Sequence, residues 1–155
     1  MFGWVSHFGR VPQTSGYRGC VTTWHGGDLD LDAYLTRIDF DGERAATTRT
    51  LAALHRAHTT SIPFENLELM LGRPIVLDLD SLQDKLIRHN RGGYCYEHVT
   101  VFAAALERLG FRFTALAGRV TLGADAMRPR THALIVVEFD DHRRWLCDVG
   151  FGRGP

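Results

Sequence analysis

The sequence lacks the features that mark several broad classes of protein. Three cysteines in 155 residues are too few for a disulfide framework. No apolar run approaches the roughly 18 residues of a membrane span, and the N-terminus has no continuous apolar segment like that of a signal peptide. Eighteen basic residues balance eighteen acidic ones, so no net charge favours nucleic acid or an anionic membrane. We therefore expect a cytoplasmic protein with free thiols, and neither nucleic acid nor a membrane as a partner.

Composition and periodicity divide the chain into three parts. Residues 1–27 are rich in Gly, Ser, Thr and His and have no helical or strand period, so we expect an extension that is poorly ordered. Residues 28–110 carry apolar side chains at helical spacing, whereas residues 111–155 show the aromatic and β-branched content of strands. Helices followed by strands predict an α+β architecture.

The individual elements follow from these patterns. The expected helical segments are 28–38, 47–62, 79–89 and 95–109. The expected strand segments are 111–120, 131–139 and 143–151, with the last two forming a hairpin. Pro63 discourages helix at the residue before it, and Gly110 favours the end of the fourth helix. Asp80 or Ser81 is the expected cap of the third helix.

The most distinctive stretch is "RGGYCYEHV", residues 91–99, which contains Cys95. At the start of a helix the Cys95 thiol would face unpaired N–H groups and the positive end of the helix dipole, and both favour the thiolate. Gly92 and Gly93 would allow close approach of the backbone before the helix. Taken alone, the stretch fits equally well a small buried cysteine behind a glycine turn.

A nucleophilic cysteine also needs a base that a third group orients. His132 begins the apolar segment "THALIVV", and Asp148 lies in "WLCDVGFG", on the other arm of the expected hairpin. A carboxylate in an apolar strand is costly unless it is paired, and neighbouring antiparallel strands would place Asp148 against His132. Each residue taken singly is more often structural, but Cys95, His132 and Asp148 together make a coherent triad.

Four motifs occur in order: "SIPFENLEL", "RGGYCYEHV", "THALIVV" and "CDVGFG". With them, the chain from about Asp28 to its C-terminus resembles the arylamine N-acetyltransferase family. The resemblance implies a helical bundle followed by an antiparallel β-barrel-like sheet, the papain-like cysteine-enzyme core. It implies that Cys95 accepts the acyl group, that His132 is the base and that Asp148 orients it. Acetyl-coenzyme A (acetyl-CoA) would be the co-substrate, without a metal, and arylamines, arylhydrazines or arylhydroxylamines would be the acceptors.

Other residues match further positions of the family's motifs. The resemblance implies that Glu65 pairs with Arg91 and, together with Gly92 and Gly93, supports the loop of the nucleophile. It also implies six residues in the lining of the acyl and arylamine pocket: Phe64, Tyr96, Val120, Thr131, Gly150 and Phe151. An apolar, aromatic lining suits a flat aryl ring. Without the resemblance, the apolar members of this set would be interpreted as ordinary core.

Two departures from the family pattern change what we expect of the chain. It stops seven residues after Asp148, so the C-terminal α/β lid and the later barrel strands would be absent. An open barrel edge exposes apolar surface and unpaired backbone groups, so we expect weak stability, self-association and reduced catalysis. In addition, Val99 stands where the family often has an asparagine.

Three alternatives stay open. A truncated, catalytically impaired relative would keep the fold and the thiol and act as a binding or regulatory remnant. A zinc site would need Cys95, His98, His132 and Cys147, but only one pair has short ligand spacing. Another papain-like thiol enzyme, of the transglutaminase or protease type, would use the same triad, but "PFEN" and "DVGFG" argue against it.

Overall fold

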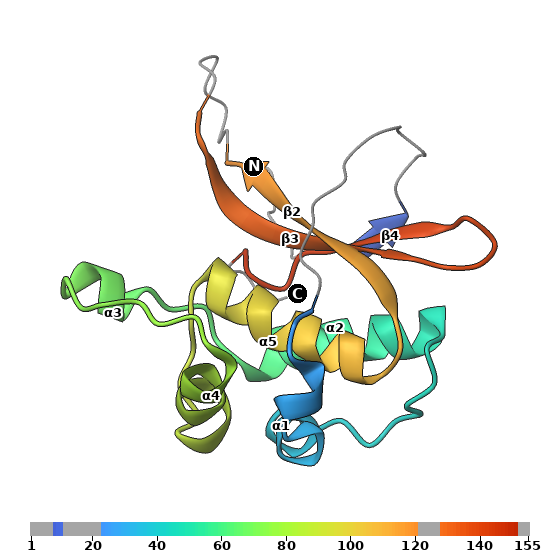
Figure 1. Ribbon diagram of the computed structural model, residues 1–155, viewed down its shortest axis with the longest axis horizontal. Coiled ribbons are helices and arrows are strands. Elements are labelled where there is room, and N and C mark those ends of the chain that lie inside the picture. The colour runs from blue at the N-terminus through green and yellow to red at the C-terminus, as the bar shows by residue number, and fades with distance from the viewer. Residues whose placement is uncertain (1–7, 11–22, 121–127, 152–155) are drawn as a thin grey trace.

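The computed structural model describes residues 8–10, 23–120 and 128–151. Helices precede most of the strands, which confirms the predicted α+β class (Figure 1). In chain order the elements are β1 (Phe8–Arg10), the 3-10 turn η1 (Gly26–Asp28), α1 (Leu31–Arg37), α2 (Thr48–Ser61), α3 (Leu67–Met70), α4 (Leu79–Leu82), the π-helical segment η2 (Gln83–Arg88), α5 (Cys95–Arg108), β2 (Arg112–Arg119), β3 (Arg130–Glu138) and β4 (Arg144–Cys147).

The strands form one antiparallel sheet in the order β1-β4-β3-β2. Ile135 of β3 pairs with Ala115 of β2 on one side and with Cys147 of β4 on the other. Within the described residues the sheet is open, with β1 and β2 at its edges, so the expected barrel is not closed there. Four short strands are too few to curve round and pair with one another at the edges.

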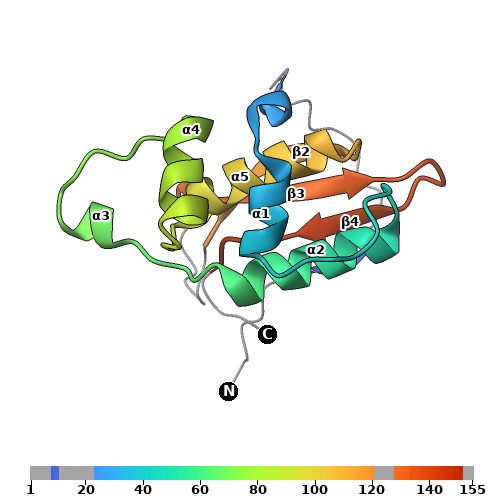
Figure 2. The ribbon, with the colours of Figure 1, turned by 90° about the horizontal axis from the view of Figure 1, so that it is seen from below.

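Helix α5 lies between the sheet and α1 (Figures 1 and 2). Ten of its fourteen residues are buried, because β2 and β3 contact it on one side and η1, α1 and α4 contact it elsewhere. On the apolar face predicted from Val99, Phe102, Leu106 and Leu109, the first three residues are at most 3% exposed and Leu109 is half-buried. The helical and strand parts therefore share one hydrophobic core, and α5 runs through it.

The helix ends follow local signals, with one correction. Helix α2 ends two residues before Pro63, and Gly110, with φ of +80°, follows α5. The cap of α4 is Asp78, whose carboxylate accepts the Ser81 N–H at 2.9 Å, so the expected cap at Asp80 or Ser81 is wrong. Asp78 and Asp80 carry the same side chain, and only the backbone conformation at each position decides which of them caps the helix.

The described parts of the N-terminal extension contact the rest of the molecule. Strand β1 pairs with β4, and the N–H groups of Trp24 and Gly26 donate to the Glu107 carboxylate at 3.0 and 2.7 Å. Residues 8–10 and 23–26 of the extension therefore have partners in the fold. Their partners are distant in sequence, and no local pattern reveals them. For residues 1–7 and 11–22, the prediction of poor order lies outside the described residues.

Helix α3 was not predicted, because its apolar residues do not pack into a core. Leu67, Leu69 and Met70 are between 47% and 75% exposed. Figure 1 shows α3 at the end of a loop that projects from the body of the molecule. Even with this apolar surface, no helix in the described part of the chain has the length and apolar character to cross a membrane.

Candidate active site

Cys95 is the first residue of α5 and is 7% exposed. The first N–H groups of a helix have no partner inside it, so they are available beside the thiol. The Glu97 carboxylate accepts the Tyr94 N–H at 2.9 Å and so caps the helix. The Cys95 thiol lies 3.7 Å from the Thr131 carbonyl oxygen, at the start of β3. The thiol therefore lies where the helix meets the sheet.

His132 and Asp148 form a buried pair next to this thiol. His132 Nε2 lies 2.8 Å from Asp148 Oδ2, and their side chains are 8% and 10% exposed. Burial alone would lower the pKa of His132, but hydrogen bonds to Asp148 and Cys95, together with the charges of both groups, raise it to about 9. Because Nε2 binds Asp148, Nδ1 is the nitrogen left for Cys95. The imidazole is therefore protonated at neutral pH and interacts with both groups.

Asp148 lies just after β4 and not within a strand, so that prediction is wrong. The ladder pairs Ile135 with Cys147 and ends there, which leaves the next residue free to turn toward His132. The Gly150 N–H donates to Asp148 Oδ1 at 3.3 Å. His55 Nε2, on α2, lies 3.3 Å from the Asp148 carbonyl oxygen and must donate to it, since a carbonyl only accepts.

Gly150 and Phe151 pack directly on Cys95 and His132. A Cβ at Gly150 would lie 2.6 Å from Cys95 Cα and 2.9 Å from Cys95 Cβ. The Phe151 ring meets the His132 ring edge-on, with centroids 5.1 Å apart. Glycine is therefore required at position 150 by close approach, and Phe151 covers one side of the imidazole.

A short parallel bridge holds the glycine turn before Cys95. The Glu65 N–H donates to the Gly93 carbonyl at 2.8 Å, and the Gly93 N–H donates to the Pro63 carbonyl at 3.2 Å. A Cβ at Gly92 would lie 2.0 Å from the Pro63 oxygen. The "PFEN" and "RGGYC" segments are thus in direct contact, and the contact leaves no room for a side chain at Gly92.

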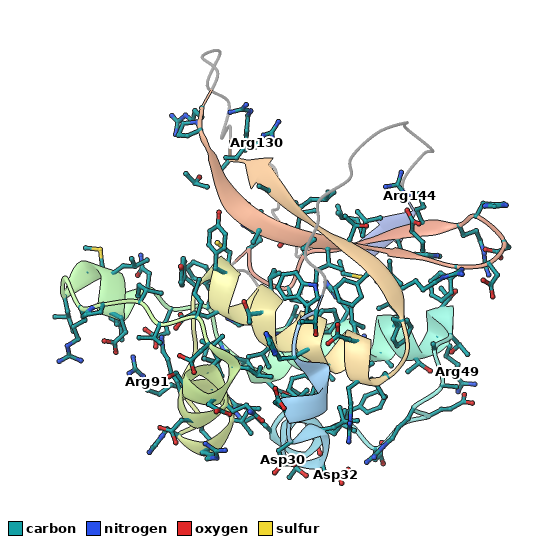
Figure 3. The ribbon with its side chains drawn as sticks, viewed as in Figure 1. Asp30, Asp32, Arg49, Arg91, Arg130 and Arg144 are labelled. Carbon is teal, nitrogen blue, oxygen red and sulfur yellow. The ribbon has the colours of Figure 1, made fainter. Side chains whose placement is uncertain are left out.

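Charged side chains brace the same turn. Arg91 lies 2.8 Å from Glu65 and 2.6 Å from Glu68, while Lys85 lies 2.7 Å from Glu97. Figure 3 shows Arg91 at the end of the molecule that carries α3 and α4. The side chains of Lys85 and Glu97 are only 15% and 4% exposed. Neither Lys85 nor Glu97 was expected at the site, although a glutamate three residues after a helix cap is a capping-box signal.

The remaining predicted pocket residues lie around the site at different depths. Phe64 is on the bridge and is 43% exposed, and the Tyr96 ring lies 5.6 Å from the Tyr94 ring. Val120 is half-buried and follows β2, at the last described residue before position 128. The structure thus brings Thr131, Gly150 and Phe151 close to Cys95, His132 and Asp148, and it places Phe64 and Tyr96 beside the glycine turn before Cys95.

The other cysteine in this region is in a different setting. Cys147 is fully buried, and its burial, with the nearby Asp148 charge, raises its pKa to about 12, so its thiol stays protonated. Among the described residues, no group of three or more His, Cys, Asp or Glu side chains could hold a metal ion. The alternative zinc site is therefore not assembled in that part of the chain.

Comparison with known proteins shows which family the chain belongs to. The family model described as N-acetyltransferase matches residues 47–155, well over half of the chain. The arylamine N-acetyltransferase of Escherichia coli (strain K12) is 46% identical over 123 residues, which are 79% of this chain and 43% of that protein. This chain belongs to the arylamine N-acetyltransferase family.

Solved structures of arylamine N-acetyltransferases match the described fold. That of Nocardia farcinica is 65% identical, with a TM-score of 0.82, over 85% of this chain and 47% of that chain. That of Mycobacterium marinum in complex with CoA is 43% identical, with a TM-score of 0.73, over 79% of this chain and 46% of that chain. The chain thus spans less than half the length of these arylamine N-acetyltransferases.

Proposed function

We propose that this chain transfers the acetyl group of acetyl-CoA to the nitrogen of arylamines, arylhydrazines or arylhydroxylamines. The observation that carries the proposal is one buried imidazole, His132, that interacts with Asp148 at 2.8 Å and also with Cys95. Cys95 is the nucleophile, His132 exchanges protons with the reactants, and Asp148 orients the ring. Family membership supports the same assignment.

The first half-reaction acetylates the enzyme. The Cys95 thiolate attacks the thioester carbonyl of acetyl-CoA, and unpaired N–H groups at the start of α5 stabilise the tetrahedral oxyanion. The carbon–sulfur bond to CoA then breaks, and the CoA thiolate takes the proton from the His132 imidazolium. The products are acetyl-Cys95, neutral His132 and CoA with a free thiol. No oxidant or metal is needed.

The second half-reaction transfers the acetyl group to the acceptor. The amine nitrogen attacks the acetyl-Cys95 carbonyl, and His132, now neutral, accepts the proton that the amine loses. The carbon–sulfur bond to Cys95 breaks, which releases the amide and restores the thiolate–imidazolium pair. Because the donor product leaves before the acceptor reacts, ping-pong kinetics are expected.

The surroundings of the triad support this chemistry. Phe151 covers the imidazole, and Phe64 and Tyr96 supply aromatic surface next to the nucleophile's turn, which suits an aryl acceptor. We include Val120, Thr131 and Gly150 in the proposed pocket, with Glu65, Arg91, Gly92 and Gly93 as its support. Apolar cover also limits hydrolysis of the acetyl-cysteine. The free thiols of Cys95 and Cys147 suit a reducing cytoplasm.

Intact-protein mass measurement after brief exposure to acetyl-CoA tests the proposal. One added acetyl group on the wild type and none on Cys95→Ser is the expected result, with His132→Gln much slower. Cys147→Ala and Cys20→Ala are the matched thiol controls and should keep the label. Addition of aniline should then remove the label and release acetanilide.

The two steps of this test separate two possibilities. Acetylation at another residue, or acetylation that persists in Cys95→Ser, would refute the assignment of Cys95 as the nucleophile. Folded protein that is never acetylated would favour the catalytically impaired remnant with a binding or regulatory role. Sedimentation of the same samples would test for self-association, which the open sheet edges at β1 and β2 would favour.

A further inference from the structure

Three aromatic rings, from α1, α2 and α5, form a hydrogen-bonded chain that the proposed reaction does not use. Tyr34 Oη lies 2.9 Å from His58 Nδ1, and His58 Nε2 lies 2.9 Å from His98 Nδ1. Tyr34 and His58 are completely buried, and His98 is 1% exposed. Phe102 packs on His58, with ring centroids 5.3 Å apart. Polar groups this deep in an apolar core are costly, so their arrangement needs a physical reason.

All three groups are uncharged at neutral pH. Burial, and then the neighbouring bases, lower the pKa of His58 well below its usual value. Burial also lowers the pKa of His98 to about 4 and raises the pKa of Tyr34. A neutral imidazole donates from one nitrogen and accepts at the other. The chain can therefore run in only one of two directions.

The backbone at the far end of the chain selects the direction. No hydrogen bond of ordinary distance and angle reaches His98 Nε2 within the described residues. The carbonyl groups of Pro63 and Gly93 nevertheless act on the His98 ring and oppose the effect of burial on its pKa. Because Nδ1 faces His58, Nε2 is the nitrogen available to these two oxygens. An N–H there attracts them at longer range, whereas a lone pair would repel them.

A proton on His98 Nε2 determines the positions of the others. His98 Nδ1 must accept, so His58 donates from Nε2 and accepts at Nδ1 from the Tyr34 hydroxyl. Every proton of the chain then points from α1 toward α5 and the two carbonyls. The reverse direction would leave the Tyr34 proton without its partner and aim a lone pair at two oxygens.

The two carbonyls belong to the bridge that holds the nucleophile's turn. Pro63 accepts the Gly93 N–H at 3.2 Å, and Gly93 accepts the Glu65 N–H at 2.8 Å. Gly93 lies two residues before Cys95, and His98 lies three residues after it, on the same helix. The His98 ring is thus acted on by both carbonyls of the bridge, while backbone N–H groups of Gly93 and Glu65 make its hydrogen bonds.

We propose that Tyr34, His58 and His98 form an uncharged hydrogen-bond chain that positions the glycine turn and, through it, the Cys95 thiol. His98 is the positioning residue, since its N–H faces the Pro63 and Gly93 carbonyls. Tyr34 and His58 fix the tautomer of His98. The inference rests on the proposed nucleophilic role of Cys95.

Two substitutions of His98 separate positioning from mere filling of the core. His98→Gln keeps a donor near the Nε2 position, whereas His98→Asn keeps an acceptor near the Nδ1 position and lacks the donor. The measurement is the second-order rate of Cys95 alkylation by iodoacetamide as a function of pH. We expect His98→Gln to stay close to the wild type and His98→Asn to be on the order of ten-fold slower at every pH, with unchanged inflection points. Equal rates, or a faster Asn variant, would overturn the proposal.

The wild-type protein supplies an independent readout. Nitrogen-15 chemical shifts of its imidazoles should show the Nε2–H tautomer for both His58 and His98. The Nδ1–H tautomer at either residue would overturn the proposal, whether or not the variants fold. If wild-type Cys95 reacts no faster than a small free thiol, the proposed function fails instead, and the tautomers still decide the direction of the chain.

Discussion

His132 Nε2 lies 2.8 Å from Asp148 Oδ2, and neither side chain is more than 10% exposed. The two residues are 16 positions apart, on β3 and directly after β4. The carboxylate keeps a proton on the imidazole that interacts with Cys95. Because the pair is shielded from water, loss of the Asp148 charge should be felt at the thiol.

Asp148→Asn preserves the shape of this pair and removes its charge. The pKa of His132 should fall, and the amide can donate to Nε2 and so favour the wrong tautomer. We expect alkylation of Cys95 at neutral pH to slow on the order of 100-fold. Asp141→Asn, an exposed carboxylate that pairs with Arg143, is the control. Identical pH–rate profiles for wild type and Asp148→Asn would contradict this role.

Gly150→Ala should be harmful although it adds only a methyl group. The new Cβ would meet the Cys95 backbone at 2.6 Å, so either the turn after Asp148 or the start of α5 must shift. We expect a loss of about 1–3 kcal/mol in the free energy of unfolding, measured by urea titration, with slower Cys95 alkylation. Gly27→Ala, where nothing lies within 4 Å of the added atom, should change neither.

Lys85→Met should destabilise the protein more than Arg91→Met. Lys85 and Glu97 form a largely buried pair, so removal of the lysine leaves a buried carboxylate without its cation, at a cost of about 3 kcal/mol. Arg91 is 40% exposed and its pairs are screened by water, so its loss should have a much smaller effect. Urea unfolding of the two variants measures this order, and the reverse order would refute it.

His132 should make the protein less stable at alkaline pH. Its folded pKa of about 9 lies above the ordinary 6.5, so the folded state holds the proton more tightly than the unfolded state. The stabilisation is complete below about pH 6.5 and is lost as pH rises toward about 9. The difference in unfolding free energy between wild type and His132→Gln should shrink over that window. His25→Gln, at an exposed position, is the control.

The buried histidines His58 and His98 should make the protein less stable at acidic pH. The pKa of His98 falls to about 4 on folding and that of His58 falls well below 6.5, so the unfolded chain binds protons that the folded protein does not. Stability should be complete above about pH 6.5 and decline as pH falls toward about 4. His98→Gln should flatten this decline, and an unchanged slope in thermal or urea unfolding would contradict the assignment.

Much of the secondary structure could be predicted because its signals are local. Helix α2 was expected at 47–62 and is found at Thr48–Ser61, and β2 was expected at 111–120 and is found at Arg112–Arg119. Both carry side chains whose period matches the face they bury. Helix α3 and strand β1 were not predicted. Helix α3 is exposed and has no buried face to give its sequence a helical period, and β1 pairs with a strand near the other end of the chain.

The candidate site, too, could be predicted only in part. Residue types and motif order pointed to Cys95, His132 and Asp148, because a nucleophile, a base and a carboxylate are chemically distinctive. Asp148 was expected inside a strand, and His55 was not expected at the site, because a hydrogen bond between α2 and the residue after β4 has no local pattern. The helical period placed His55 and His58 on the face of α2 that carries Leu51 and Leu54, but no local pattern indicated the hydrogen bond from His58 to His98 on α5.

The sequence by itself determined which chemical groups are present and which local conformations they favour: a cysteine behind two glycines at a helix start, and two polar residues in apolar segments. Only the tertiary structure decided the distances between them. The packing of α5 on β2 and β3 and the turn after β4 place one imidazole in contact with both a carboxylate and a thiol. Hydrogen bonds and pKa shifts depend on such distances and on burial, and these arise only when residues far apart in the chain share one core.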